Sequence, residues 1–288
     1  MSAHLQGGVY LSDKRGLWAL YEGDAAMARM AALGIALGDG ARIGDGACIG
    51  DRASIGDGAR IGDGARIGDW ASIGAWASIG DRASIGDRAS IGDGASIGDR
   101  ASIGDGASIG DRASIGDRAS IGDRASIGDG ARIGDGARIG AWASIGDGAR
   151  IGDGASIGAW ASIGDRASIG DGASIGDRAS IGDGARIGDG ACIGDRASIG
   201  VDGRVPRTAT HHVMGPLGSD SRMLTGYRGS NGEIRAATSC FDGTMEELES
   251  RVREYSDTEH GRRYLAAAQA LRSLVADLTP GEIAEVTP

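Results

Sequence analysis

The amino-acid sequence is poor in the residues from which most globular cores are built. It has one Phe, five Trp and five Tyr among 288 residues, but 55 Gly. This composition excludes an ordinary core of aromatic and leucine side chains, so we expect apolar residues to be buried in a repeating pattern. Lysine is nearly missing, and a formal net charge of -10 leaves no basic excess for binding a phosphate backbone. We therefore expect no nucleic-acid partner.

Cysteines and long apolar stretches are scarce too. Cys48, Cys192 and Cys240 lie far apart, without the spacing of a disulfide framework or a zinc site. We expect three free thiols, no metal and no bound cofactor. No stretch approaches the roughly 18 apolar residues that span a bilayer, and the first residues lack the pattern of a secretory signal. These features predict no membrane partner and a place in the cytoplasm, a virion or another assembly.

A repeat of six residues fills most of the chain. Residues 37–198 consist of 27 uninterrupted hexads of the form I-G-D-x-A-x, whose residues we number one to six. Position one is Ile in every hexad after Leu37, position two is Gly and position five is Ala. A Gly in each hexad would cost a helix about 1 kcal/mol each, and the strict spacing of Ile and Ala is unlike a disordered linker. Positions five and one lie two apart, so they share one face of a short strand while position six points outward.

Hexads such as I-G-D-G-A-R and I-G-D-R-A-S resemble the hexapeptide repeat of left-handed parallel β-helix proteins. The resemblance implies an all-β solenoid of about nine triangular coils with three hexads per coil. It also implies that Ile and Ala point inward and that Gly lies where the corner requires unusual dihedrals. An 18-residue period supports three hexads per coil, because every third position-six residue from Ser54 to Ser198 is Ser.

The same period predicts surface columns for interaction with a partner. Trp70, Trp142 and Trp160 share one corner, which would place Trp142 and Trp160 on adjacent coils, whereas Trp76 lies on another corner. Five position-six arginines share one face: Arg42, Arg60, Arg132, Arg150 and Arg186. These columns suit a protein or glycan partner, although recent duplication of the DNA would produce the same periodicity. The Asp at position three, present in 24 hexads, can form only weak exposed ion pairs with Arg, so solvation of the surface is its expected purpose.

Four segments are expected along the chain. Residues 1–36 should form an N-terminal hairpin and a capping helix, and residues 37–200 the hexapeptide-repeat β-helix. Residues 201–219 should form a connector, and residues 220–288 a hairpin plus two helices. In that last segment, residues 223–228 and 233–238 flank a turn, and capping boxes that begin at Thr244 and Ser256 open the helices.

The segment of residues 215–248 resembles an uncharacterised module associated with phage and prophage proteins. That resemblance implies a viral or mobile-element origin. It supplies no catalytic residue.

Two functions remain open. The leading hypothesis is a structural or interaction protein, because the solenoid is unbroken. The alternative is a hexapeptide-repeat acyltransferase that uses acetyl-CoA or a related acyl donor; the resemblance implies a homotrimer with a His as general base. The hexads contain no His and no loop, so the candidate bases are His211 and His212, with His4 and His260 behind them. A solvated connector is the other interpretation of the His211–His212 pair. A third class is recognition of a repetitive surface such as ice, mineral or glycan by the flat Ser face. Ice binding fits the sequence poorly, because one Ser per coil flanked by Arg is unlike regular ranks of Thr.

Overall fold

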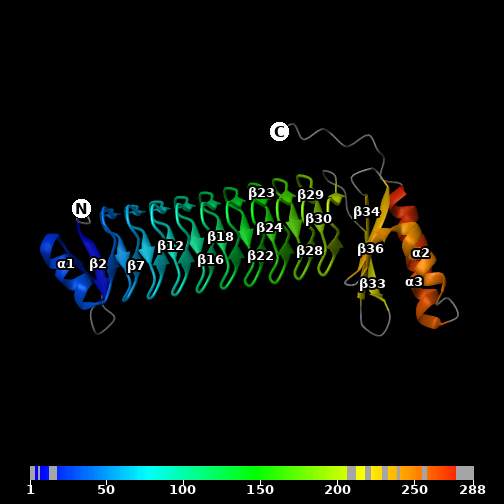
Figure 1. The fold of residues 1–288 in the computed structure, drawn as a ribbon, viewed down its shortest axis with the longest axis horizontal. Coiled ribbons are helices and arrows are strands. Elements are labelled where there is room, and N and C mark those ends of the chain that lie inside the picture. The colour runs from blue at the N-terminus through cyan, green and yellow to red at the C-terminus, as the bar shows by residue number, and fades with distance from the viewer. Residues whose placement is uncertain are drawn as a thin grey trace. The chain divides into compact units, whose positions relative to one another are not determined.

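The computed structural model describes residues 4–5, 7–12, 18–205, 212–217, 222–228, 233–238, 241–254 and 258–276 (Figure 1). The chain divides into two compact units, residues 1–154 and 155–288, which are described one after the other. The four segment boundaries expected from the sequence stay predictions.

Each hexad of the first unit forms one two-residue strand and one turn. Positions six and one make the strand, and positions three and four make the turn. Each strand pairs in parallel with the strand 18 residues further on, so that Arg42 lies beside Arg60 and Ile43 beside Ile61. Three hexads per coil are thereby confirmed. The fold is a left-handed parallel β-solenoid of about nine coils.

Three sheets, named faces A, B and C, form the sides of the coils in the first unit. Face A consists of β1 (His4–Leu5), β5 (Arg42–Ile43), β8 (Arg60–Ile61), β11 (Ser78–Ile79), β14 (Ser96–Ile97), β17 (Ser114–Ile115), β20 (Arg132–Ile133) and β23 (Arg150–Ile151). Face B consists of β3 (Trp18–Tyr21), β2 (Val9–Ser12), β6 (Cys48–Ile49), β9 (Arg66–Ile67), β12 (Ser84–Ile85), β15 (Ser102–Ile103), β18 (Ser120–Ile121) and β21 (Arg138–Ile139). Face C consists of β4 (Ala36–Leu37), β7 (Ser54–Ile55), β10 (Ser72–Ile73), β13 (Ser90–Ile91), β16 (Ser108–Ile109), β19 (Ser126–Ile127) and β22 (Ser144–Ile145).

The core consists of the position-one and position-five side chains, as predicted. Ile43 and Ala41 are fully buried, and the other repeat Ile side chains are at most 3% exposed. Each buried Ile contributes roughly 1.5 to 3 kcal/mol of transfer free energy. Backbone bonds between coils complete the pattern: Arg42 N–H donates to Ala59 O at 2.9 Å, and Gly44 N–H donates to Ile61 O at 2.8 Å. Burial and backbone pairing therefore explain why these positions do not vary.

Glycine has two different roles in the hexad. At position two it permits a close approach, because a Cβ on Gly62 would lie 2.7 Å from the backbone nitrogen of Asp81 in the next coil. The left-handed dihedrals occur instead at position four, where φ is +65° at Gly64, +59° at Arg52 and +61° at Trp70. The expectation that Gly supplies the unusual corner dihedrals therefore holds only for hexads with Gly at position four.

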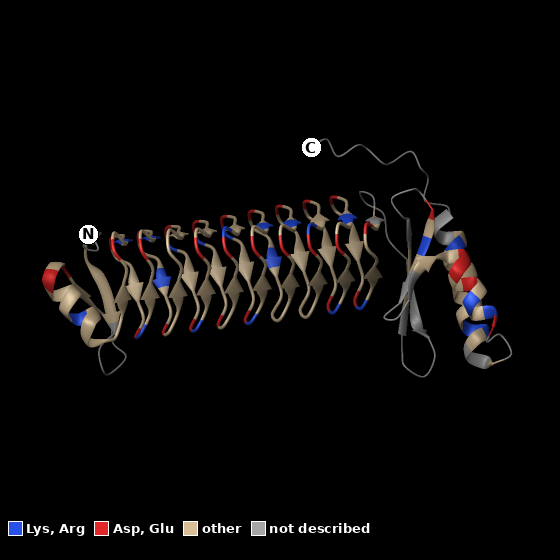
Figure 2. Ribbon diagram, in the orientation of Figure 1, with Lys and Arg blue, Asp and Glu red and all other residues tan. Residues whose placement is uncertain are grey.

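The Asp residues at position three have a role that the sequence analysis missed. The N–H of Asp63 donates to the Asp81 carboxylate at 2.9 Å, one coil on, and the same bond recurs along each corner. We call this series the Asp ladder and each bond a rung. Figure 2 shows the acidic residues recurring at the turns. The carboxylates thus bind backbone N–H groups of the preceding coil, whereas only weak ion pairs and solvation had been expected of them.

The N-terminal hairpin and helix are confirmed and cover the first coil. β2 and β3 pair antiparallel, and β1 and β2 pair in parallel with β5 and β6. Helix α1 (Gly23–Ala32) buries Ala26 and Met30. Gly8 N–H donates to the Asp45 carboxylate at 3.0 Å, which adds one more rung. These contacts pair the backbone N–H and C=O groups at the edge of the first coil, which would otherwise be free to bind a strand of another chain.

The second unit contains further coils and a small α+β region. Its coil strands are β24 (Ser156–Ile157), β25 (Ser162–Ile163), β26 (Ser168–Ile169), β27 (Ser174–Ile175), β28 (Ser180–Ile181), β29 (Arg186–Ile187), β30 (Cys192–Ile193), β31 (Ser198–Ile199) and β32 (Arg204–Val205). The α+β region comprises β33 (His212–Leu217), β34 (Arg222–Arg228), β35 (Ile234–Thr238), β36 (Phe241–Thr244), α2 (Met245–Arg253) and α3 (Glu259–Ala276). Its core comprises Leu224, Ala236, Met245, Leu248, Ala267, Ala268 and Leu271.

Most of the elements expected in this region are present. β34 and β35 form the predicted hairpin, and Thr244 forms the predicted capping box with Glu247. Ser256 lies outside the described residues; Thr258 Oγ1 accepts the N–H of Gly261 at 3.0 Å.

The connector expected at residues 201–219 needs a correction, because it contains the strand β33. Among the described strands β33 pairs only with β34, and its register shifts between Met214 and Leu217. Pro216 is tolerated there because an edge strand has backbone positions that need no ladder hydrogen bond. The two prolines of the segment had been taken as signs of irregular chain.

The α+β region also covers the last coil of the second unit. Thr225 on β34 is fully buried, and its hydroxyl oxygen accepts the N–H of Ser198 at 3.0 Å. In the other coils the N–H at this position donates to a backbone carbonyl of the next coil. The last coil has no next coil, so the Thr225 hydroxyl takes the place of that carbonyl.

Candidate functional site

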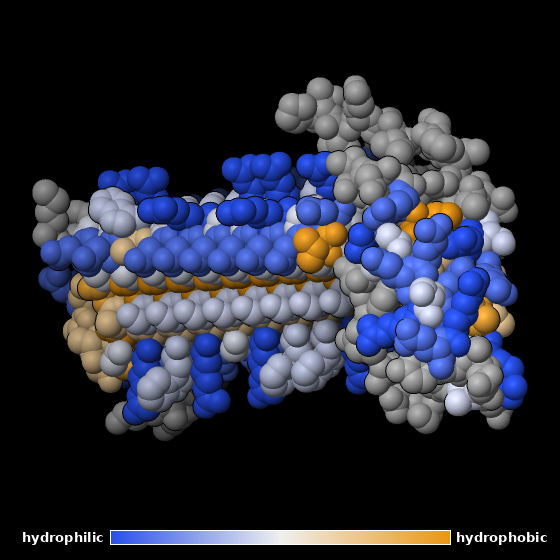
Figure 3. All heavy atoms as spheres, turned by 45° about the vertical axis from the view of Figure 1, so that its right-hand side comes forward, coloured by the Kyte–Doolittle hydropathy of each residue, from blue (hydrophilic) through white to orange (hydrophobic). Residues whose placement is uncertain are grey.

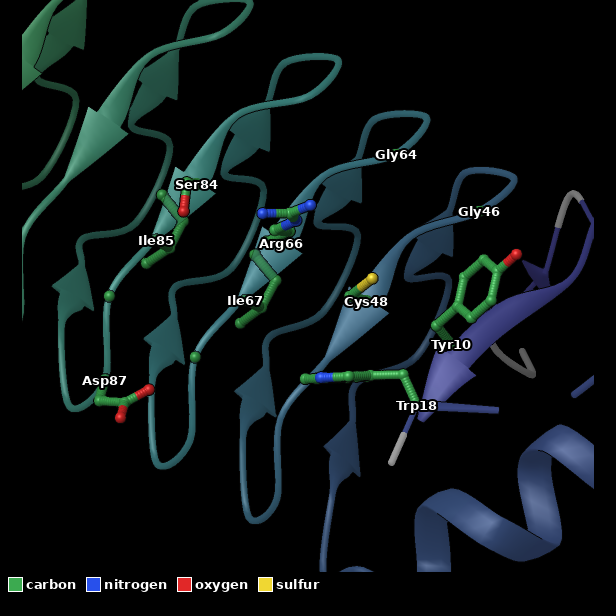
Figure 4. A pocket seen from close by; sticks show the side chains of 12 residues that line it. Tyr10, Trp18, Gly46, Cys48, Gly64, Arg66, Ile67, Ser84, Ile85 and Asp87 are labelled. Atoms are coloured by element: carbon green, nitrogen blue, oxygen red, sulfur yellow. The ribbon is translucent and has the colours of Figure 1, made fainter. Parts of the chain in front are cut away.

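A hollow of about 700 Å³ lies on face B beside the N-terminal hairpin, and Figure 4 shows it from close by. All of its lining residues belong to the first unit. They are Tyr10, Trp18, Gly46, Cys48, Gly64, Arg66, Ile67, Gly68, Ser84, Ile85, Gly86 and Asp87.

Strand register places four side chains of the hollow in one row. Tyr10 lies beside Cys48, Cys48 beside Arg66, and Arg66 beside Ser84. Neighbouring strands are about 4.8 Å apart, so a ligand of modest length contacts several of these side chains at once. Figure 4 shows the four side chains on successive strands of face B. The row combines a phenol, a thiol, a guanidinium and a hydroxyl on one flat surface.

Two aromatic rings and one carboxylate complete the lining. Tyr10 is 37% exposed and Trp18 is 49% exposed, so each ring offers apolar surface to a ligand. Asp87 follows β12, and its carboxylate accepts the N–H of Asp69 at 2.9 Å. The hollow therefore has a cation, Arg66, between an aromatic end and an acidic end.

The surroundings of Cys48 disfavour the thiolate form of its side chain. Burial raises the pKa of its thiol, and the positive charge of Arg66 offsets only part of that rise. A thiol with a raised pKa stays protonated at neutral pH, and the thiolate is the reactive form. Cys48 and Cys192 are free, whereas Cys240 lies outside the described residues. The hollow is therefore better suited to binding than to covalent chemistry.

The predicted Trp column is exposed and partly covered by Arg. Trp70 lies at the corner between faces B and C, is 54% exposed, and has the Arg52 guanidinium 4.4 Å from its ring centre. Trp142 is 43% exposed and has Arg124 at 4.7 Å in the same arrangement. Trp160 is exposed in the second unit. Its adjacency to Trp142 stays a prediction.

The predicted Arg column divides into pairs. Arg42 and Arg60 lie in register on face A, and so do Arg132 and Arg150. Three strands that carry Ser at position six, β11, β14 and β17, lie between the two pairs. Arg186 lies in the second unit beside Ser168. The structure therefore shows separate basic pairs, and a role for them in interaction stays a prediction.

The candidate histidines remain untested. His211 lies outside the described residues, and the structure describes only the backbone of His212, within β33. The side chains of His4 and His260 are likewise not described. In the described part of the chain no group of three or more His, Cys, Asp or Glu residues is placed to hold a metal ion. None of the described helices is both long and apolar enough to cross a membrane.

The hollow was not found from the sequence. Tyr10 and Cys48 are 38 residues apart, which is no multiple of 18, because α1 interrupts the chain between them. The one available signal was the unusual Cys48 and Arg66 in neighbouring coils, and by itself that pair pointed to no site.

Six segments of the chain match the family model for the bacterial transferase hexapeptide (six repeats): residues 40–75, 77–111, 100–134, 112–146, 130–165 and 166–200. Together these segments cover more than half of the chain. The chain belongs to the bacterial transferase hexapeptide family. Family membership favours the acyltransferase alternative over the structural role that the sequence analysis put first. The phage-module resemblance of residues 215–248 receives no such support. No match is found among the curated proteins.

Several solved structures are similar to the chain. UDP-N-acetylglucosamine acyltransferase from Arabidopsis is 18% identical, with 86% of this chain and 95% of that chain covered and a TM-score of 0.47. The enzyme of the same name from Francisella novicida is 19% identical, with 86% and 90% covered and a TM-score of 0.35. UDP-N-acetylglucosamine O-acyltransferase from Moraxella catarrhalis is 18% identical, with 83% and 97% covered and a TM-score of 0.30. Similarities at this level say nothing about the activity of this chain.

Proposed function

We propose that the protein is an acyltransferase that binds an acyl thioester donor, such as acetyl-CoA, in the hollow on face B. Membership of the hexapeptide transferase family supports this proposal. The observation that carries it is the row of Tyr10, Cys48 and Arg66 under the hairpin, because it sets aromatic surface beside a guanidinium.

This row suits the chemistry of a coenzyme A donor. The guanidinium of Arg66 can pair with a phosphate through two parallel hydrogen bonds, and the rings of Tyr10 and Trp18 can stack on a purine. The carboxylate of Asp87 repels phosphate, so the anionic part of the donor should lie toward the hairpin. The protonated thiol of Cys48 leaves the thioester intact. The hollow thus binds the donor and does not consume it.

Acyl transfer then needs an acceptor and a base. The acceptor oxygen or nitrogen forms a bond to the acyl carbon, the carbon–sulfur bond breaks, and the proton of the acceptor passes through the base to the departing thiolate. His211 and His212 remain the candidate bases. We expect a homotrimer, in which the base and the hollow need not belong to the same subunit.

A structural or interaction role is the second candidate, and one observation favours it. No hexad from residue 37 to residue 198 contains a His, and no loop interrupts the coils. A solenoid of this kind presents flat faces that suit assembly with a partner protein. In that case the hollow would be a by-product of the N-terminal hairpin.

Thermal unfolding with acetyl-CoA separates the two candidates. A donor at about 100 times its dissociation constant stabilises the folded protein by about 2.7 kcal/mol, which raises the melting temperature by several degrees. We expect this rise in the unmodified protein and its loss in Arg66→Ser. Arg138→Ser is the matched control, because Arg138 has the same position on face B outside the hollow. No rise with any acyl-CoA would favour the structural role.

Turnover is then measured as the release of free thiol from acetyl-CoA in the presence of amine and sugar acceptors. His211→Ala or His212→Ala should abolish turnover and leave the thermal shift unchanged. Full turnover in both variants would exclude these two residues as the base.

A further inference from the structure

Trp76 occupies an unfavourable place in the solenoid. It lies at the corner between faces C and A, with a φ of +60°, a region that bulky residues avoid. Gly58 and Gly94 occupy the same position in the coils before and after it. Its side chain is 74% exposed, the largest value among the exposed large hydrophobic residues that the structure describes. Neither backbone conformation nor burial therefore accounts for a Trp at this position.

The residue before Trp76 weakens the fold further. Ala replaces Asp at position three only three times, each time directly before a Trp: Ala75, Ala141 and Ala159. Ala75 has no carboxylate to accept the N–H of Asp57, whereas Asp81 accepts that of Asp63 at 2.9 Å. Trp70 follows Asp69, so a Trp at position four does not require Ala before it. Residues that break the repeat pattern and do not stabilise the fold are typical of functional positions.

Trp70 and Trp76 stand on the two edges of one strand of face C. They precede and follow β10, which consists of Ser72 and Ile73. The preceding coil supports both rings: a Cβ on Gly58 would lie 2.7 Å from the Trp76 ring, and the Arg52 guanidinium lies 4.4 Å from the Trp70 ring centre. Both indoles are thus held against the corners while 54% of Trp70 and 74% of Trp76 stay exposed.

The coil that carries the two rings has no charged side chain between them, although the carboxylate of Asp93 on the next coil accepts the N–H of Ala75 at 2.7 Å. Ser54, Ser72 and Ser90 lie in register on β7, β10 and β13, so hydroxyl groups repeat about every 4.8 Å. Figure 3 shows this face as a continuous pale strip along the coils. Ala75 removes a negative charge from one border of the strip, beside Trp76. The Ser hydroxyl groups of face C therefore form a neutral surface, which we call the Ser floor, with one Trp ring at each of its two borders.

We propose that Trp70, Trp76 and the Ser floor between them bind a neutral oligosaccharide. Sugar rings have an apolar C–H face that stacks on indole, and their hydroxyl groups exchange hydrogen bonds with Ser hydroxyls, which both donate and accept. The two Trp are six residues apart, which limits their separation to about 20 Å, so an oligosaccharide of a few rings is long enough to contact both. This site lies on another face than the hollow and does not depend on the proposed acyl transfer.

A peptide ligand fits the same surface less well. An extended peptide binds a sheet by adding a strand to a free edge. On face C the backbone groups of β10 are bonded to the coils on both sides, for instance Ser72 N–H to Ala89 O and Ser54 N–H to Ala71 O, both at 2.9 Å. Side chains alone are left for recognition, and here they are hydroxyl groups and indoles.

The experiment is affinity electrophoresis of the full chain in native gels that contain hydroxyethylcellulose, dextran or galactomannan. We expect at least one of these neutral polymers to retard the unmodified protein. The double variant Trp70→Arg and Trp76→Gly should lose at least tenfold in apparent affinity, because both replacements already occur at these corners. Arg112→Gly is the matched control, since Arg112 lies in the Trp76 column two coils further on, and it should be retarded like the unmodified protein.

Three results would overturn the proposal. The first is that none of the three polymers retards the unmodified protein, and the second is that the double variant is retarded as strongly as the unmodified protein. The third is that the protein binds no glycan but self-associates, and that the double variant loses this self-association. Circular dichroism of both variants checks that the coils are intact. A second variant covers the case in which the double variant does not fold: Ala75→Asp restores the rung and the charge, so it should raise the melting temperature and still weaken retardation. If Ala75→Asp leaves retardation unchanged, the charge argument is wrong and the proposal falls with it.

Discussion

The guanidinium carbon of Arg52 lies 4.4 Å from the centre of the Trp70 ring on the next coil. Both residues have left-handed dihedrals, with φ of +59° and +61°, so the backbone alone favours Gly at each position. The contact between the two side chains offsets part of that strain. It also holds Trp70 in one orientation at the edge of face C.

This contact should be measurable as a coupling free energy. In a double-mutant cycle of Arg52→Gly and Trp70→Gly, we expect an interaction of about 0.5 to 1 kcal/mol from urea unfolding. Each single replacement should change stability little, because Gly relieves the strain while the contact is lost. A cycle of Arg52→Gly with Trp76→Gly is the control and should be additive, since Trp76 lies at another corner. Equal coupling in both cycles would mean that the Arg–Trp contact has no specific effect.

The Asp ladder should be visible as a stability difference between two similar replacements. Asp81→Ala removes the acceptor of the Asp63 N–H and should cost about 1 kcal/mol of unfolding free energy. Asp81→Asn keeps an acceptor oxygen at the same place and should cost less. Urea unfolding of the two variants side by side makes the comparison. If both lose the same amount, the negative charge, and not the hydrogen bond, is what matters.

The two glycines of one hexad should respond differently to Ala. Gly62→Ala places a Cβ 2.7 Å from the backbone nitrogen of Asp81, and the coils cannot separate without breaking bonds, so we expect a loss of about 3 kcal/mol. Gly64→Ala places its Cβ 3.5 Å from Arg82 at a φ of +65°, so we expect a loss of about 1 kcal/mol from backbone strain alone. The difference in midpoint of thermal unfolding tests the two roles. A larger loss at Gly64 would contradict them.

The thiol of Cys48 should react slowly at neutral pH. Burial raises its pKa, so in a Cys192→Ser, Cys240→Ser background the rate of alkylation by iodoacetamide should rise with pH around a midpoint above the ordinary thiol value. Arg66 favours the charged thiolate, so Arg66→Ser should move that midpoint to still higher pH. The midpoint of the pH profile is measured, because the replacement also changes access. A midpoint that stays in place would show that Arg66 does not act on Cys48.

Sequence reasoning was accurate where one contact repeats every 18 residues. A side chain such as Ser72 lies beside Ser54 and Ser90 because three hexads return the chain to the same face, and the period alone predicts that. It was less accurate for residues 201–219. The prolines there were interpreted as signs of an irregular connector, but Pro216 lies in an edge strand. The hollow could not be predicted, because helix α1 lies between Tyr10 and Cys48 in the sequence and breaks the 18-residue period. Only the strand pairing of the structure places Tyr10 beside Cys48.

The hexad pattern of Ile, Gly and Ala determined the strands and the buried core, and the 18-residue period of the position-six residues determined the register of the coils and the division of polar residues among three faces. They could do so because each of these depends on a repeated local choice between inward and outward side chains. Only the tertiary structure decided what the variable residues do: that Asp caps the backbone of the preceding coil, that Arg and Trp bear the left-handed corners, and that the hairpin brings aromatic rings to Arg66. These features depend on contacts between residues of different coils, which the order of residues along the chain does not reveal.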